Sequence, residues 1–123
     1  MKIKKLCASL AVVAAGFGFA QPAQAALQAA PKKCGGNLVC LYAHADYGGF
    51  LGSRRAGLGL MNISPKANDK MSSWINRTTR NASWFEHANG KGKCYTMRQN
   101  SINNFVGWPP NDTASSWRTN RGC

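Results

Sequence analysis

The sequence has 123 residues, enough for one domain, and its 16 lysines and arginines outnumber its four acidic residues to give a net charge of +12. The basic residues are spread along the chain, and no dense basic or aromatic motif typical of a nucleic-acid-binding module occurs, so a specific nucleic-acid function is excluded. The charge is compatible with binding to anionic cell-surface polymers, or with a role in solubility alone.

The N-terminus has the pattern of a secretory signal peptide. Residues 1–5 contain three lysines, residues 6–20 are apolar or small, and residues 21–25 end in an Ala-x-Ala cleavage site. The apolar run is shorter than the roughly 20 residues that a transmembrane helix needs, and no later segment is longer. We therefore expect residues 1–25 to be removed, leaving a secreted, extracellular monomer with a net charge of about +9 and no transmembrane segment.

The signal peptide is followed by a lead-in segment at residues 26–37, which contains the first of four remaining cysteines. An even number of scattered cysteines in an exported chain indicates two disulfides rather than a zinc site. Three pairings are possible. We favour Cys34 with Cys40, which bracket a Gly-Gly-Asn turn, and Cys94 with Cys123, which would tie down the last residue.

The rest of the chain repeats itself at an offset of 43 residues. Residues 42–46 (Tyr-Ala-His-Ala-Asp) match residues 85–89 (Phe-Glu-His-Ala-Asn), and residues 68–74 (Asn-Asp-Lys-Met-Ser-Ser-Trp) match residues 111–117 (Asn-Asp-Thr-Ala-Ser-Ser-Trp). Equal spacing over a whole unit indicates a tandem duplication. We place the two repeats at residues 40–78 and 83–121 of a domain that spans residues 38–123.

Each repeat has the pattern of short strands. Apolar or aromatic runs of strand length lie at residues 38–43, 50–55 and 71–76 of the first repeat and at residues 82–87, 93–98 and 114–118 of the second. Glycine-rich turns join the first two runs into a hairpin, and the segment before the third run is rich in Gly, Asn and Pro, which disfavours a long helix. These runs account for three strands per repeat; with a fourth strand in each, we predict an all-β fold in which two tandem Greek-key motifs form a disulfide-stapled β-sandwich. Large aromatic residues, above all Trp74 and Trp117, are expected to anchor its core.

These residues resemble those of two related families. The pattern of Tyr42, Tyr47 and Gly49 is similar to the aromatic hairpin of βγ-crystallin Greek keys, and both Asn-Asp-x-x-Ser-Ser segments fit the calcium motif of that superfamily's microbial members. The opening at residues 34–42 (Cys-Gly-Gly-Asn-Leu-Val-Cys-Leu-Tyr) resembles the start of secreted bacterial peptidase inhibitors with a βγ-crystallin-like fold. The resemblance implies this fold over the mature chain and, as function, inhibition of a secreted peptidase, in particular a metallopeptidase. In the second hairpin Gly90 replaces the second aromatic residue, so we expect a looser packing corner there.

The resemblance also implies that the two motifs bind calcium crosswise. Each ion would take a backbone carbonyl and a hydroxyl from one motif and a carboxylate from the other, with the asparagines supporting the loops. The residues concerned are Asn68, Asp69, Lys70 and Ser72 of the first motif and Asn111, Asp112, Thr113 and Ser115 of the second. One acidic residue per motif in a basic protein predicts weak binding. The alternative is that these residues only form turns, since Asn, Asp and Ser side chains bond readily to nearby backbone groups.

An enzymatic function is not expected. The only two histidines, His44 and His87, occupy equivalent positions in the repeats, which suggests a structural role, and neither accompanies a recognisable nucleophile motif. Three functions remain open: a peptidase inhibitor, a calcium-stabilised extracellular structural or binding module, and a cationic antimicrobial or cell-envelope-binding protein. The sequence does not identify an inhibitor reactive site, for which the turn at residues 34–40 and the loop at residues 99–110 are candidates.

Overall fold

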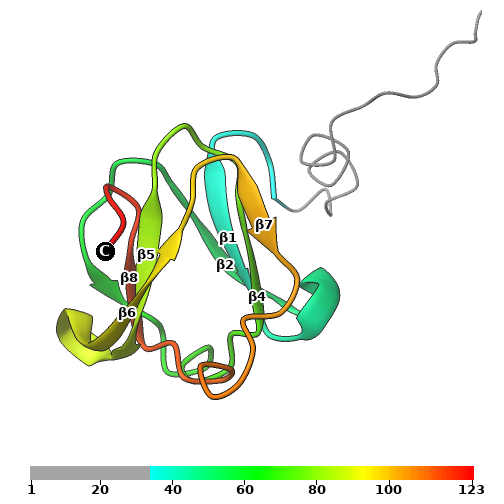
Figure 1. Ribbon diagram of the computed structural model, residues 1–123, viewed down its shortest axis with the longest axis vertical. Helices are drawn as coiled ribbons and strands as arrows, with labels where there is room; N and C mark the ends of the chain where they lie inside the picture. Colours follow the sequence, from blue (N-terminus) through cyan, green and yellow to red (C-terminus); the bar gives the residue numbers. More distant parts are fainter. Residues whose placement is uncertain (1–33) are drawn as a thin grey trace, which may run out of the picture.

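The structure of the protein is a computed structural model that describes residues 34–123 (Figure 1). The expected signal peptide and most of the lead-in segment lie outside the described residues. Within the described part, regular structure consists of β-strands and two single-turn 3-10 helices, and no helix there is long and apolar enough to cross a membrane.

The strands form two antiparallel four-stranded sheets (Figure 1). The first repeat contributes β1 (Leu38–Tyr42), β2 (Phe50–Arg55), β3 (Met61–Asn62) and β4 (Ser73–Asn76), with the 3-10 turn η2 (Ala45–Tyr47) in its hairpin. The second repeat contributes β5 (Ala82–His87), β6 (Lys91–Met97), β7 (Ser101–Asn103) and β8 (Ser116–Arg118), with η3 (Ala88–Gly90) at the equivalent place. The strand order is β2-β1-β4-β7 in one sheet and β3-β8-β5-β6 in the other.

The third strand of each repeat lies in the sheet of the other repeat. β7 pairs with β4, where Ile102 faces Ile75, and β3 pairs with β8, where Met61 faces Trp117. Each sheet is therefore completed by a strand from the other repeat. The prediction of two tandem Greek-key motifs in one all-β sandwich is confirmed.

Some strand ends differ from the prediction by two residues. β4 and β8 begin at Ser73 and Ser116, two residues late, because Met71 and Ala114 give their carbonyls to backbone N–H groups of the opposite motif loop instead of to a neighbouring strand. β6 begins at Lys91, two residues early, inside the predicted turn.

The main core lies between the two sheets, and both repeats contribute to it. Trp84 is 1% exposed and stacks on Tyr95 with 4.2 Å between ring centroids. Burial of such large side chains supplies much of the driving force for folding. The core cluster consists of Val39, Leu41, Met71, Trp74, Ala82, Trp84, Met97, Ala114 and Trp117. The expected burial of Trp74 and Trp117 is thus confirmed.

In each hairpin a histidine ring packs on a glycine. Gly49 and Gly92 have φ values of +68° and +77°, which glycine adopts without strain. A Cβ on Gly49 would lie 2.9 Å from His44 Cδ2, and a Cβ on Gly92 would lie 2.5 Å from His87 Cδ2. The equivalent placement of the two histidines therefore has a structural explanation.

The hairpin corners are packed differently in the two repeats. In the first, Tyr47 meets Tyr42 edge-on with 5.9 Å between ring centroids. In the second, Gly90 takes the place of Tyr47, and a Cβ on Gly90 would lie 2.9 Å from Leu60 Cδ2. A side chain of the first repeat therefore covers this corner in place of the absent aromatic residue.

The disulfides join Cys34 to Cys40 and Cys94 to Cys123, the pairing favoured from the sequence. The first closes the turn that leads into β1, and the second fastens the C-terminal residue to β6. Their sequence separations are 6 and 29 residues. Loop-closure entropy gives stabilisations of about 2 and about 3.5 kcal/mol for loops of these lengths.

Candidate metal centre at the crossed motif loops

The two Asn-Asp-x-x-Ser-Ser loops lie side by side at one end of the sandwich, the lower end in Figure 1. The Asp69 N–H donates to the Ala114 carbonyl at 2.9 Å, and the Asp112 N–H donates to the Met71 carbonyl at 3.1 Å. Both aspartates have left-handed backbone conformations, with φ values of 60° and 61°, which Asp and Asn adopt more readily than most residues. The turn at each aspartate thus joins its backbone to the loop of the other repeat.

The side chains of the two motifs are also paired crosswise. The Ser115 hydroxyl donates to Asp69 Oδ1 at 3.0 Å, and the Ser72 hydroxyl donates to Asp112 Oδ1 at 3.2 Å. Both serines are buried, whereas both carboxylates are exposed. Each carboxylate therefore lies beside the hydroxyl of the other motif.

The first oxygen cluster surrounds Ser72. Its hydroxyl oxygen lies 2.8 Å from the Ala43 carbonyl oxygen as well as 3.2 Å from Asp112 Oδ1. A hydroxyl has one proton and cannot donate fully to both. This cluster lies in a surface pocket that is also lined by Lys70 and Asn111. The amide oxygen of Asn111 is buried without a hydrogen-bond partner.

The second oxygen cluster surrounds Ser115. Its hydroxyl oxygen lies 3.0 Å from Asp69 Oδ1 and 3.3 Å from the Thr113 carbonyl oxygen. This cluster lies in a second pocket, which Glu86 and Pro109 also line. This cluster mirrors the first across the two repeats, except that its nearest carbonyl comes from the motif itself.

The donor set of both clusters fits a hard cation. Carboxylate, hydroxyl and carbonyl oxygens are the ligands that calcium prefers. Residues 34–123 contain no group of three or more His, Cys, Asp or Glu side chains placed to hold a metal. Asp69 and Asp112 line the pockets of both clusters, and Glu86 lines the second, so an ion at either cluster would depend on backbone carbonyls and water in addition to these carboxylates.

The two asparagines of the motifs support the loops. The Asn68 N–H donates to the Ser64 carbonyl at 2.9 Å, and the Asn111 N–H donates to the Gly107 carbonyl at 2.8 Å, so each closes a turn just before its motif. Lys70 is exposed at the edge of the first pocket.

Sequence reasoning missed the Ala43 carbonyl, because a backbone ligand leaves no mark on residue type. The only signal in the sequence for this position is the 43-residue offset between the repeats, which makes Ala43 equivalent to Glu86.

Comparison with known proteins decides the family. Residues 27–97, which include the Cys34–Cys40 turn and the first motif, match the model of peptidase inhibitor family I36. The chain belongs to this family. Membership in I36 confirms the expectation of a protein that is not an enzyme. Together with the two disulfides, it indicates an extracellular protein whose partner is a peptidase.

This I36 chain shares its fold with βγ-crystallin domains of known structure. A double mutant of a βγ-crystallin domain from Clostridium beijerinckii is 28% identical, with a TM-score of 0.54 over 66% of this chain and 93% of that chain. A βγ-crystallin domain from Flavobacterium johnsoniae is 25% identical, with a TM-score of 0.53 over 67% and 91%. A structure from work on the evolution of the eye lens βγ-crystallin fold is 20% identical, with a TM-score of 0.57 over 68% and 84%, and shows likeness of fold alone. No curated protein sequence matches the I36 chain.

Proposed function

We propose that this I36 protein inhibits a secreted metallopeptidase and that each of its two oxygen clusters binds one calcium ion weakly. Family membership supports inhibition. One observation supports calcium: each buried serine hydroxyl lies within hydrogen-bond distance of two further oxygens, one of them a carboxylate from the other repeat. Residues retained only as turns would be expected to bond within their own loop.

The fold is suited to a rigid inhibitor. The sheets exchange strands, the last residue is held by a disulfide, and the motif loops are bonded to each other. A loop that is already ordered gives up little conformational entropy on binding, which favours affinity. Bound calcium would neutralise the charges of Asp69 and Asp112 and raise the stability of the fold by mass action. This fits an extracellular protein, because calcium is abundant outside cells.

Thermal unfolding tests the calcium part of the proposal. We expect the melting temperature to rise by several degrees in millimolar calcium relative to excess chelator, with magnesium giving a smaller shift. A variant with Ser72→Ala and Ser115→Ala should lose most of this shift. Superimposable curves for the unaltered protein in calcium and chelator would refute the sites.

A panel of secreted peptidases tests the inhibitory part. We expect near-stoichiometric inhibition of at least one metallopeptidase, with serine and cysteine peptidases as controls for class. Inhibition confined to those controls would contradict a metallopeptidase target. A calcium shift without inhibition of any class would instead favour a calcium-stabilised extracellular module.

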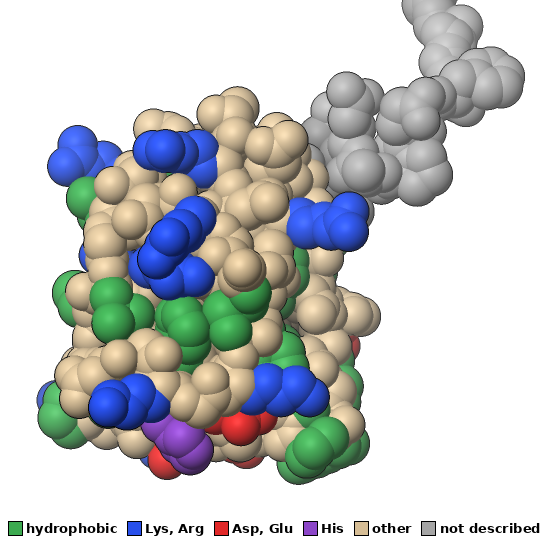
Figure 2. Space-filling view, turned by 60° about the vertical axis from the view of Figure 1, so that its left-hand side comes forward, with side chains coloured by type: hydrophobic (Ala, Val, Ile, Leu, Met, Phe, Trp, Pro, Cys, Tyr) green, Lys and Arg blue, Asp and Glu red, His purple; other side chains and the backbone are tan. Residues whose placement is uncertain are grey.

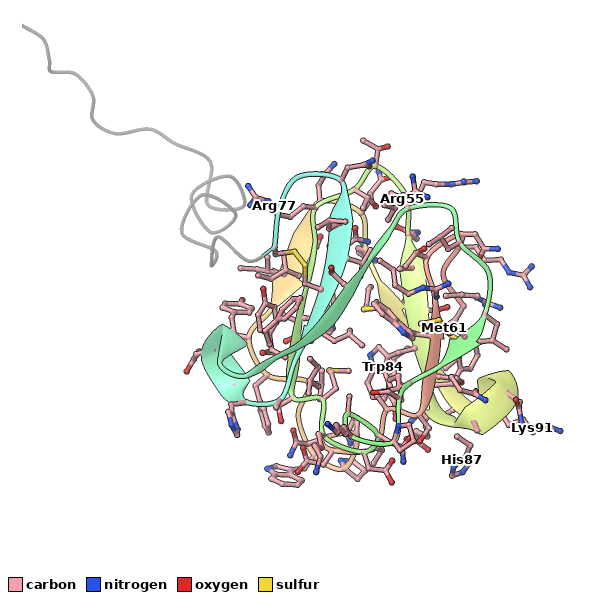
Figure 3. The ribbon with its side chains drawn as sticks, turned by 180° about the vertical axis from the view of Figure 1, so that it is seen from behind. Arg55, Met61, Arg77, Trp84, His87 and Lys91 are labelled. Carbon is pink, nitrogen blue, oxygen red and sulfur yellow. A yellow bond between two sulfur atoms is a disulfide. The ribbon has the colours of Figure 1, made fainter. Side chains whose placement is uncertain are left out.

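Binding to anionic cell-envelope polymers is a second candidate function, favoured by the distribution of charge. Arg55 ends β2 opposite Leu38, and the Arg77 N–H donates to the Leu38 carbonyl, so both lie at the end of the sandwich remote from His87 and Lys91 (Figure 3). Further arginines follow β4 and β6 or precede the C-terminus, namely Arg80, Arg98 and Arg121. On the face shown in Figure 2, the carboxylates lie at the opposite end, and most basic side chains lie away from them.

Two variants with equal loss of charge test this second function. One replaces Arg55, Arg80, Arg98 and Arg121 with alanine, and the other replaces Lys66, Lys70, Lys91 and Lys93 with alanine. If the arginine end binds the polymer, the arginine variant should lose salt-sensitive binding to an anionic cell-wall preparation, and the lysine variant should keep most of it. Equal loss in both variants would indicate attraction by net charge alone.

A further inference from the structure

The most exposed of the large hydrophobic side chains described is Trp108. It is 74% exposed, whereas the other three tryptophans of the chain are buried. Phe105, itself 36% exposed, lies against it edge-on with 5.9 Å between ring centroids. An indole ring kept in water forgoes the stabilisation that burial of a large apolar side chain contributes. Trp108 is therefore a candidate for burial against a partner.

The loop that carries this pair, residues 104–110, is fixed on the side that precedes Trp108. The Asn104 amide donates to Asp46 Oδ1 at 3.2 Å, and the Asp46 N–H donates back to the Asn104 carbonyl at 2.9 Å. The Val106 N–H donates to the Ser72 carbonyl at 2.9 Å, and its side chain packs against the main core. The first repeat therefore holds the start of this aromatic loop at two points.

The aromatic loop is also fixed on the side that follows Trp108. The Asn111 N–H donates to the Gly107 carbonyl at 2.8 Å, and the Thr113 hydroxyl donates to the Pro110 carbonyl at 2.6 Å. Pro109 and Pro110 restrict the backbone further, since the ring of proline fixes φ. Trp108 therefore lies on a loop that is ordered before any partner binds. Such order lowers the entropy lost on binding, so a residue on this loop can contribute strongly to affinity.

The charge around the aromatic loop argues against a membrane surface as its partner. Residues 99–117 contain no lysine or arginine, Asp46 and Asp112 lie at the ends of the loop, and Lys70 is the one lysine or arginine of the described residues that lines the neighbouring pocket. An aromatic anchor for anionic lipid is normally accompanied by basic residues. A protein pocket lined by apolar side chains has no such requirement.

We propose that Trp108 enters an apolar side-chain pocket of the target peptidase, with Phe105 packing at the rim of that contact. This inference rests on the proposed inhibitory function and identifies the surface that carries it. It also specifies the partner, a peptidase whose binding cleft accepts large aromatic or aliphatic side chains. A single tryptophan at the centre of an interface commonly dominates its binding energy.

Inhibition constants against a peptidase inhibited by the unaltered protein test the proposal. We expect Trp108→Ala to weaken inhibition by on the order of 100-fold, Trp108→Phe to recover part of it, and Phe105→Ala to have an intermediate effect. The matched control is Met61→Ala, which removes another exposed apolar side chain, 48% exposed, from β3. Melting curves establish that each variant is folded.

A direct readout accompanies the kinetics. Protein labelled with 5-fluorotryptophan should give one fluorine resonance per tryptophan, and the resonance absent from Trp108→Phe should be the one that shifts most when unlabelled peptidase is added. Unchanged inhibition by Trp108→Ala, or an unshifted Trp108 resonance in the inhibited complex, would overturn the proposal. If the unaltered protein inhibits no peptidase, the proposed function fails and this inference fails with it.

Discussion

Ser115 donates a hydrogen bond of 3.0 Å to Asp69, which lies 46 residues earlier in the other repeat. Asp112 and Ser72 form the reciprocal pair over 40 residues. The two candidate calcium sites are thus composite, and neither belongs to one motif.

This pairing makes the sites separable by double substitution. Asp69→Ala and Ser115→Ala should each damage the same site, so the double variant should still bind one calcium ion per chain. The combination of Asp69→Ala with Ser72→Ala damages both sites and should bind none. Titration calorimetry at high protein concentration measures the stoichiometry. Loss of both ions in the Asp69→Ala, Ser115→Ala variant would contradict the crosswise assignment.

Gly92→Ala should destabilise the fold by at least about 1 to 2 kcal/mol, because φ is +77° there and the new methyl group would meet His87. Gly52→Ala is the matched control, since a Cβ on Gly52 has no neighbour within 4 Å and its φ lies outside the left-handed region. Chemical denaturation gives both values. Equal stability of the two variants would show that the second hairpin relaxes without strain.

Removal of the two disulfides should have unequal effects. Replacing Cys94 and Cys123 with serine opens a link over 29 residues and should lower the free energy of unfolding by about 3.5 kcal/mol, against about 2 kcal/mol for Cys34 and Cys40 over 6 residues. Urea titration of each double variant checks the order. A larger loss at Cys34 and Cys40 would mean that burial of this disulfide outweighs loop closure.

The three tyrosines should ionise late in the folded protein. Burial raises the pKa of Tyr42 and Tyr47, and burial together with the 2.6 Å hydrogen bond to Glu86 raises the pKa of Tyr95 to about 12. The folded-state pKa values exceed the unfolded value of about 10, so the protonated tyrosines stabilise the folded state. Their contribution to the free energy of unfolding is fully present below pH 10 and is lost as the pH rises toward 12.

Tyrosinate absorbance during an alkaline titration measures this effect. The midpoint should fall to about 10 in denaturant. Glu86→Gln should lower the pKa of Tyr95 and leave that of Tyr42 unchanged. Ionisation of all three tyrosines at the same pH in folded and unfolded protein would contradict the burial of these hydroxyls.

Local features of the fold could be predicted from the sequence. The hairpin strands follow from short apolar runs and glycine turns, and β2 and β5 have the predicted bounds. β3 and β7 could not be located, because two or three residues carry no periodic pattern and their pairing is decided by the other repeat. The cover of Gly90 by Leu60 is equally long-range.

The candidate site was accessible to sequence reasoning in part. Asp69, Ser72, Asp112 and Ser115 could be named because their side chains are distinctive and occur twice at one spacing. The Ala43 carbonyl and the exposure of Trp108 depend on where the chain turns, which residue type does not specify.

The exchange of β3 and β7 also bears on how the duplicated chain arose. A lone repeat would keep three strands of its sheet and lack the fourth, and it would leave a sheet edge and half of each Asp–Ser pair without a partner. Two identical single-repeat chains related by a two-fold axis would complete both sheets and both oxygen clusters at once. Joining them end to end turns an association that depends on protein concentration into an intramolecular one. In these terms the present protein has the architecture of a two-fold dimer whose two halves are covalently joined.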